Sequence, residues 1–158
     1  VGMPSCGKSA IGKKLSQMLD RPFCDTDELL EKRFGITPCD YINGYGERSF
    51  RDTESMIVSE CAAMSCGVIA TGGGAVLRPQ NVRALLRNGR IYFIDRDLSA
   101  LKPSPDRPLS HDRETLGKMF HARYPLYKDV SDVTVDGNMS VDEVAKAIRK
   151  EFCQNTEE

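Results

Sequence analysis

The sequence predicts an α/β fold in which helices cover both faces of a mainly parallel sheet. Short apolar runs, such as Val68–Ala70 and residues 91–94, alternate with segments whose apolar residues recur at helical spacing. A glycine-rich loop over residues 2–9 opens directly into a helix. The 158 residues suit one compact domain over 1–158, and we find no internal repeat and no linker.

The first third of the chain contains helices separated by turn residues. Apolar side chains spaced by four, seven and eight positions predict a helix from Lys8 that stops near Asp20. An extended piece over 22–25 leads into a second helix at 27–34, which Gly35 ends.

The middle of the chain continues the alternation. Proline is favoured at the first position of a helix, so we expect a short helix to start at Pro38. A longer helix is expected at about 47–64. Three glycines at 72–74 follow the strand at 68–70, and a helix over 81–88 separates this strand from the one at 91–94.

The last third begins with a loop that cannot form a core. Residues 102–113 hold three prolines and several charges, which predicts an exposed loop. A β-branched strand is expected at 133–135. Ser140 and Glu143 then have the spacing of a capping box, which predicts the start of a C-terminal helix.

Residues 2–9 match the motif G-x-x-x-x-G-K-[ST] in full. Backbone N–H groups of such a loop surround phosphates, Lys8 reaches the terminal phosphate oxygens and Ser9 offers a hydroxyl to magnesium. The alternative, a chance glycine-rich turn, does not explain why a helix follows. Because this motif normally follows a strand and the chain begins at Val1, we expect the central strand to lie outside this sequence.

Two acids, Asp25 and Asp27, follow the predicted strand at 22–25. At the carboxyl end of a parallel sheet, one could hold hydrated magnesium and the other a substrate hydroxyl. The alternative is a helix N-cap formed by Thr26 or Asp27. The pattern leaves both interpretations open.

Arginines and a glycine triplet form the remaining candidates. Arg51, with Glu54 three residues later, is either a surface ion pair or an oriented guanidinium that binds a carboxylate. Three glycines at 72–74 weaken any structure unless backbone comes very close to another group. Taken singly, Arg107 fits a solvated loop charge and Arg123 a cation at a helix end.

Taken in order, the segments GMPSCGKS, DTD, GERSFRDTE, ATGGGA, DRPLS and RYPLY resemble shikimate kinase, a P-loop family related to nucleoside-monophosphate kinases. The resemblance covers nearly the whole chain from Gly2. It implies a three-layer α/β/α P-loop fold with a mainly parallel five-stranded sheet, whose first strand is largely missing from this chain. It also implies a mobile lid loop at about 102–116.

The resemblance implies a reaction and a set of site residues. The protein would use ATP and Mg²⁺ to phosphorylate the 3-hydroxyl of shikimate, giving shikimate 3-phosphate and ADP in aromatic amino-acid (chorismate) biosynthesis. The implied catalytic residues are Lys8, Asp27 and Arg107. The implied ATP-binding residues are Pro4, Ser5, Cys6, Gly7, Lys8, Ser9, Ala10 and Arg107. The implied shikimate-binding residues are Asp27, Arg51, Gly72, Gly73, Gly74 and Arg123, and the implied metal-binding residues are Ser9 and Asp25.

Two other functions remain as alternatives. One is the kinase of another small polyol acid such as gluconate, and the other is a nucleotide-binding domain without catalysis. A formal net charge of −1 favours neither nucleic acid nor membrane as partner. We expect a cytoplasmic protein, because no apolar signal run or membrane-length segment is present. We also expect a monomer, and reduced cysteines because a chain of 158 residues with helical and strand periodicity does not need a disulfide framework.

Overall fold

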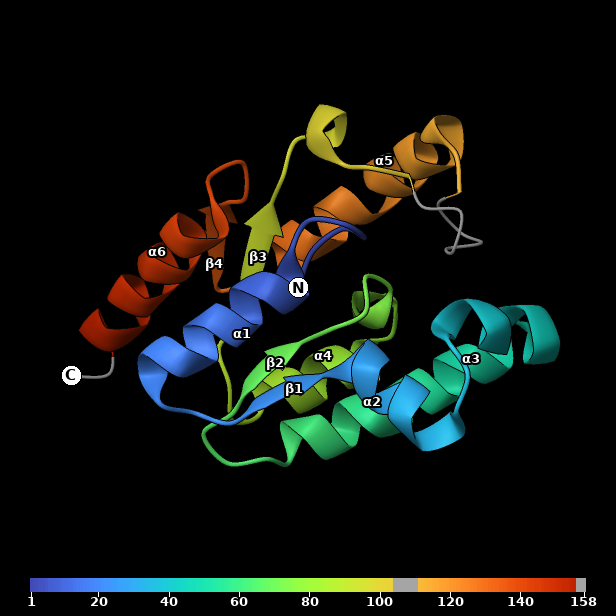
Figure 1. Cartoon of the computed structure of the whole chain (residues 1–158), viewed down its shortest axis with the longest axis horizontal. Coiled ribbons are helices and arrows are strands. Elements are labelled where there is room, and N and C mark those ends of the chain that lie inside the picture. The colour runs from blue at the N-terminus through green and yellow to red at the C-terminus, as the bar shows by residue number, and fades with distance from the viewer. Residues whose placement is uncertain (104–110, 156–158) are drawn as a thin grey trace.

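The computed structural model describes residues 1–103 and 111–155, which form an α/β structure (Figure 1). The α-helices are α1 (Lys8–Leu19), α2 (Thr26–Phe34), α3 (Pro38–Ala62), α4 (Pro79–Leu86), α5 (Arg113–Val130) and α6 (Val141–Gln154). The strands are β1 (Phe23–Asp25), β2 (Val68–Ala70), β3 (Tyr92–Asp95) and β4 (Val133–Asp136). Two short 3₁₀ helices, η1 (Ala75–Leu77) and η2 (Leu98–Ala100), follow β2 and β3.

The strands pair in two parallel sets. In the first, β1 pairs with β2, with Asp25 opposite Ala70. In the second, β3 pairs with β4, with Ile94 opposite Val135. The predicted α/β class with parallel pairing is therefore confirmed, although the described residues form two separate two-stranded sheets and not one sheet of five.

Val1 lies between the two pairs. Its amino group donates to the carbonyl oxygen of Tyr92 at 2.8 Å, and its own carbonyl accepts from the N–H of Ile94 at 3.0 Å. This alternation is the hydrogen-bond pattern of a parallel strand. Beyond Val1, a cavity of about 230 Å³ runs between β2 and β3 and is lined by apolar side chains that include Ile11 and Leu15.

Helices lie on both faces of these strands. Figure 1 shows α1 in front of β2 and α4 behind it, and α1 packs against α6. The larger buried cluster joins α1, β3, α5 and α6 and includes Phe93, Leu116 and Ile148. None of the described helices has the length and apolar character needed to cross a membrane.

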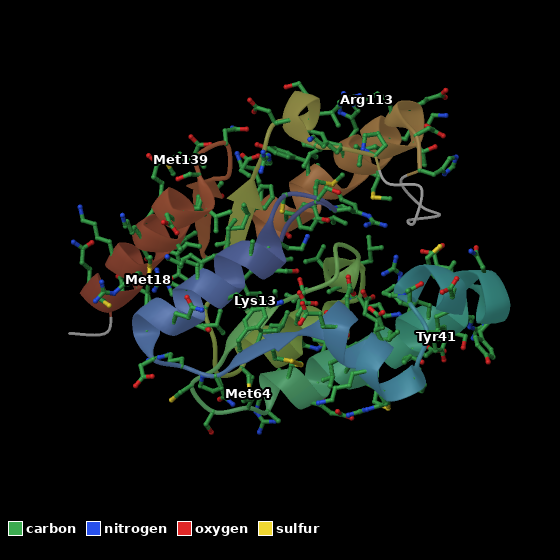
Figure 2. All side chains as sticks on the ribbon, viewed as in Figure 1. Lys13, Met18, Tyr41, Met64, Arg113 and Met139 are labelled. Atoms are coloured by element: carbon green, nitrogen blue, oxygen red, sulfur yellow. A yellow bond between two sulfur atoms is a disulfide. The ribbon has the colours of Figure 1, made fainter. Side chains whose placement is uncertain are left out.

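The two helices predicted from Pro38 and near residue 47 are halves of α3. Gly46 separates them, because its backbone at φ 84° and ψ 158° is not helical. Tyr41, labelled on the first half in Figure 2, holds that half in place by ring contacts with Phe34 and Phe50 at 5.7 and 6.2 Å. The second half of α3 carries Arg51, whose guanidinium lies next to Gly74 in the glycine turn after β2.

Helix α5 differs from expectation. The sequence suggested a helix end at Arg123, because Pro125 follows closely. The helix instead runs through Pro125 to Val130, so Arg123 lies in its interior and the helix-end interpretation is wrong. Asp112 caps the first turn by accepting from the N–H of Thr115 at 2.7 Å. Residues 113–116, placed in the lid by resemblance, therefore belong to this helix.

Two cysteines also differ from expectation. Cys24 on β1 and Cys61 on α3 form a disulfide, with their Cα atoms 6.5 Å apart. The prediction that the cysteines are reduced is wrong for this pair. The bond joins β1, whose last residue is Asp25, to the helix that carries Arg51.

Candidate active site

The phosphate loop curls around the side chain of Lys8. Its ammonium group donates to the carbonyl oxygens of Gly2 at 2.9 Å and Met3 at 2.7 Å. Helix α1 begins at Lys8, and in the described structure no side chain caps its first turn. The backbone N–H groups of that first turn, at the positive end of the helix dipole, are free to bind a phosphate.

Ser5 and Cys6 of the phosphate loop have different environments. Ser5 has φ 64° and Gly7 has φ 95°, a left-handed backbone that forms anion-binding turns. Cys6 is fully buried in the core, with its sulfur 3.8 Å from the Lys8 nitrogen. Its side chain therefore fills the core, and only its backbone can serve a phosphate. Ala10 is exposed on α1.

Ser9 and Asp25 join the phosphate loop to the end of β1. The Ser9 hydroxyl donates to Asp25 Oδ2 at 2.5 Å. Asp25 Oδ1 accepts from the N–H groups of Asp27 at 2.9 Å and Glu28 at 3.2 Å, which caps α2. The predicted cap by Thr26 or Asp27 is thus wrong, because Asp25 takes that position. A hydroxyl and a carboxylate beside a phosphate loop are hard oxygen ligands that fit a hydrated Mg²⁺.

The glycine turn, residues 72–74, lies against the other motifs. A Cβ atom on Gly72 would come within 2.8 Å of oxygen atoms of Asp27 and Glu54. A Cβ atom on Gly73 would lie 2.9 Å from the Pro4 ring of the phosphate loop. The glycines are therefore required by close approach, as their sequence predicted.

Arg51 is buried, not on the surface. Its guanidinium lies 2.8 Å from the Glu54 carboxylate and 3.2 Å from that of Glu47. Arg51 and Glu54 are only 7% and 3% exposed, so the surface-ion-pair interpretation is wrong. The Nε of Arg51 has no hydrogen-bond partner, and a Cβ on Gly74 would overlap the guanidinium. A buried, oriented guanidinium with an unused donor is suited to an anionic ligand.

Arg123 is a second buried cation, 8% exposed. Among the described residues no acidic side chain forms an ion pair with it. Burial raises the pKa of Tyr127 to about 12, against the opposing effects of Arg123 and Arg51, so both guanidiniums act on this hydroxyl. Arg51 is paired with Glu54 and Glu47, whereas the buried charge of Arg123 is costly without an anion beside it. The site therefore suits a negatively charged substrate.

Of the predicted site residues, Arg107 lies outside the part of the chain that the structure describes. Thr26, Asn81 and Tyr127 were not predicted, yet each is buried and hydrogen-bonded to backbone of the glycine turn or η1. Tyr127 belongs to the RYPLY segment and Thr26 to DTD, so both motifs contained a signal for them. No group of three metal-binding His, Cys, Asp or Glu side chains occurs within the described ranges.

A phosphate loop with its lysine, a hydroxyl–carboxylate pair and a buried anion site define a P-loop kinase of a small acidic molecule. Comparisons identify the family. The family model described as shikimate kinase matches residues 4–153. The shikimate kinase of Thermoanaerobacter pseudethanolicus is 35% identical over 159 residues, covering 96% of this chain and 92% of the relative. The chain belongs to the shikimate kinase family.

Solved structures agree with this assignment. The shikimate kinase of Acinetobacter baumannii in complex with shikimate has a TM-score of 0.90 and 26% identity, covering 98% of this chain and 91% of the neighbour. A gluconokinase from Sinorhizobium meliloti has a TM-score of 0.54 at 14% identity, a likeness of fold alone. The predicted family, kinase activity and ATP use are confirmed, and the gluconate alternative has less support.

Proposed function

We propose that this chain phosphorylates the 3-hydroxyl of shikimate by holding the substrate carboxylate with Arg51 and Arg123. The observation that carries the proposal is the pair of buried guanidiniums beside Tyr127. Shikimate is a carboxylic acid with three hydroxyl groups, so a fork of guanidinium donors at one end orients its ring. The glycine turn then brings backbone against the substrate.

Asp27 receives the hydroxyl that reacts. Its carboxylate lies at the Gly72 position of the glycine turn, beside the anion site. There it accepts a hydrogen bond from the 3-hydroxyl and takes its proton as the phosphoryl group is transferred. Little covalent chemistry is needed, because phosphoryl transfer depends mainly on aligned reactants and on compensation of phosphate charge.

The phosphates of ATP bind in the phosphate loop. The backbone N–H groups of residues 5–7 and of the first turn of α1 donate to them, and Lys8 turns from the carbonyls of Gly2 and Met3 onto the phosphate oxygens. We also propose that Arg107, which lies outside the described residues, compensates phosphate charge.

Ser9 and Asp25 would hold the magnesium ion that accompanies ATP, because their side-chain oxygen atoms lie 2.5 Å apart beside the phosphate loop. A bound ion would supply compensation of the phosphate charge. Ser9 and Asp25 thus connect nucleotide binding to α2, which carries Asp27.

A substrate panel tests the proposal. ADP release is measured with shikimate, with gluconate and without an acceptor, at equal MgATP concentrations. We expect release that depends on shikimate and yields shikimate 3-phosphate. Turnover of gluconate without turnover of shikimate would overturn the proposal. ADP binding without any acceptor turnover would favour a non-catalytic domain.

We further propose that the protein acts as a monomer in the cytoplasm, without nucleic acid or membrane partners. The net charge of −1 supports the absence of nucleic-acid and membrane partners, since it offers no global attraction to polyanions. Sedimentation velocity tests the oligomeric state: one species of about 17.6 kDa is expected, and a stable dimer would contradict the proposal.

A further inference from the structure

One buried tyrosine links helix α5 to the glycine turn. The hydroxyl of Tyr127 donates a 2.5 Å hydrogen bond to the carbonyl oxygen of Gly73. The side chain is fully buried, and its ring stacks on Phe93 of β3 with centroids 5.2 Å apart at 20°. Packing therefore fixes the ring, and with it the position of the hydroxyl.

The rest of the turn is held from other helices. The hydroxyl oxygen of Thr26 on α2 accepts from the N–H of Gly72 at 2.9 Å. The side-chain amide of Asn81 on α4 donates to the carbonyl of Ala75 at 2.9 Å. Three helices thus hold Gly72, Gly73 and, just after the turn, Ala75 of η1, and α5 does so through Tyr127 alone among the hydrogen bonds of the described residues.

The same helix carries Arg123 one turn earlier. Residues four apart lie on one face of a helix, and both side chains are buried. We propose that Tyr127 is a positioning residue for the acidic substrate, setting the distance between the Arg123 guanidinium and the glycine turn. This inference rests on the proposed roles of Arg123 and Gly73 in shikimate binding.

The hydroxyl of Tyr127 must stay protonated to donate its hydrogen bond to the carbonyl of Gly73. Burial raises its pKa to about 12, so the hydroxyl remains a donor throughout the neutral range. Because the ring is held by Phe93, removing the hydroxyl alone leaves the packing in place. The hydrogen bond can therefore be tested separately from the fold.

The test compares Tyr127→Phe with Tyr124→Phe. Tyr124 is on the same helix, and its hydroxyl donates to Asp95 at 2.8 Å, away from the glycine turn. For Tyr127→Phe we expect the KM for shikimate to rise about threefold to tenfold, the range for loss of one hydrogen bond. The kcat and the KM for ATP should stay within about twofold, and Tyr124→Phe should leave all three nearly unchanged.

If Tyr127 only stabilised the fold, its replacement would affect the kinetic constants in a different way. If Tyr127→Phe lowers kcat and raises both KM values together, or if the KM for shikimate is unchanged, the inference is wrong. As a second measurement, Tyr127→Phe is introduced into an Arg123→Lys background. A shared role predicts a smaller effect there than in the wild-type chain, and full additivity would overturn it. Absence of any shikimate turnover by the wild-type chain would instead refute the proposed function.

Discussion

The guanidinium of Arg51 lies buried against the carboxylate of Glu54, with Nη1 and Oε2 2.8 Å apart. The ion pair leaves Nε unused and directs the arginine toward the anion site beside the glycine turn. Glu54 is therefore a positioning residue, because it fixes the guanidinium without occupying all its donors.

Replacing Arg51 separates binding from folding. In Arg51→Lys the charge remains but the planar fork is lost, so we expect the KM for shikimate to rise at least about tenfold. The KM for ATP should change little. Arg51→Ala should also destabilise the fold by about 3–5 kcal/mol, because it leaves Glu54 buried without a counter-ion.

Arg48→Ala is the matched control for Arg51. Arg48 is on the same helix but exposed. Its replacement should change neither shikimate use nor the melting temperature appreciably. Equal effects of the two substitutions on the KM for shikimate would remove Arg51 from the site.

The glycine turn offers a test of close approach. In Gly74→Ala the new methyl group would displace the Arg51 guanidinium, so kcat/KM for shikimate should fall by about tenfold to a hundredfold. The control is Gly44→Ala at an exposed position of α3, where no atom lies within 4 Å of a new Cβ. That change should stabilise the helix by about 1 kcal/mol without affecting activity. Normal activity of Gly74→Ala would show that the turn tolerates a side chain.

The metal site is tested through Ser9. Removal of its hydroxyl in Ser9→Ala should raise the Mg²⁺ concentration needed for half-maximal activity by about tenfold, while Ser9→Thr retains the ligand and should stay close to wild type. A magnesium titration at saturating ATP measures this. Identical titration curves for Ser9→Ala and wild type would mean that Ser9 does not bind the metal.

The capping box of α6 governs stability at acid pH. Ser140 accepts from the N–H of Glu143 at 3.3 Å, while the Ser140 hydroxyl and N–H lower the pKa of the Glu143 carboxyl. A lowered folded-state pKa adds stability that is present above the unfolded pKa and lost as pH falls through the folded one. Ser140→Ala should lower the melting temperature by about 2–4 °C at pH 7 and by less near pH 3. An equal decrease at both pH values would contradict this.

The cavity between β2 and β3 allows a test of whether this space can hold a further β-strand. Val1 already pairs with β3 in a parallel pattern, and apolar side chains line the space beyond it. Adding five β-branched residues before Val1 should raise the melting temperature, since both strand edges gain hydrogen bonds. A glycine–serine extension of equal length is the control. An equal effect of both extensions would show that the space does not hold a strand.

Much of this fold could be predicted from local patterns. The strand at 68–70 and the capping box at Ser140 depend on neighbouring residues, so the sequence contains their signal. The end of helix α5 was placed wrongly at Arg123 because proline usually ends a helix, whereas here the helix continues through Pro125 to Val130.

The site was predicted less completely than the fold. Local spacing makes Arg51 and Glu54 look like any surface pair, because burial depends on segments distant in sequence. Tyr127 is a similar case, since its hydrogen-bond partner lies 54 positions earlier in the chain. Only the ordered set of motifs, read together, indicated a common site.

The role of the two arginines is tested most directly by comparing shikimate with its methyl ester. Esterification removes the negative charge and leaves all three hydroxyl groups in place. The wild-type chain should use the ester with a kcat/KM lower by about tenfold to a hundredfold, the range for lost hydrogen bonds to charged groups. Equal kcat/KM values for acid and ester would contradict carboxylate binding by Arg51 and Arg123.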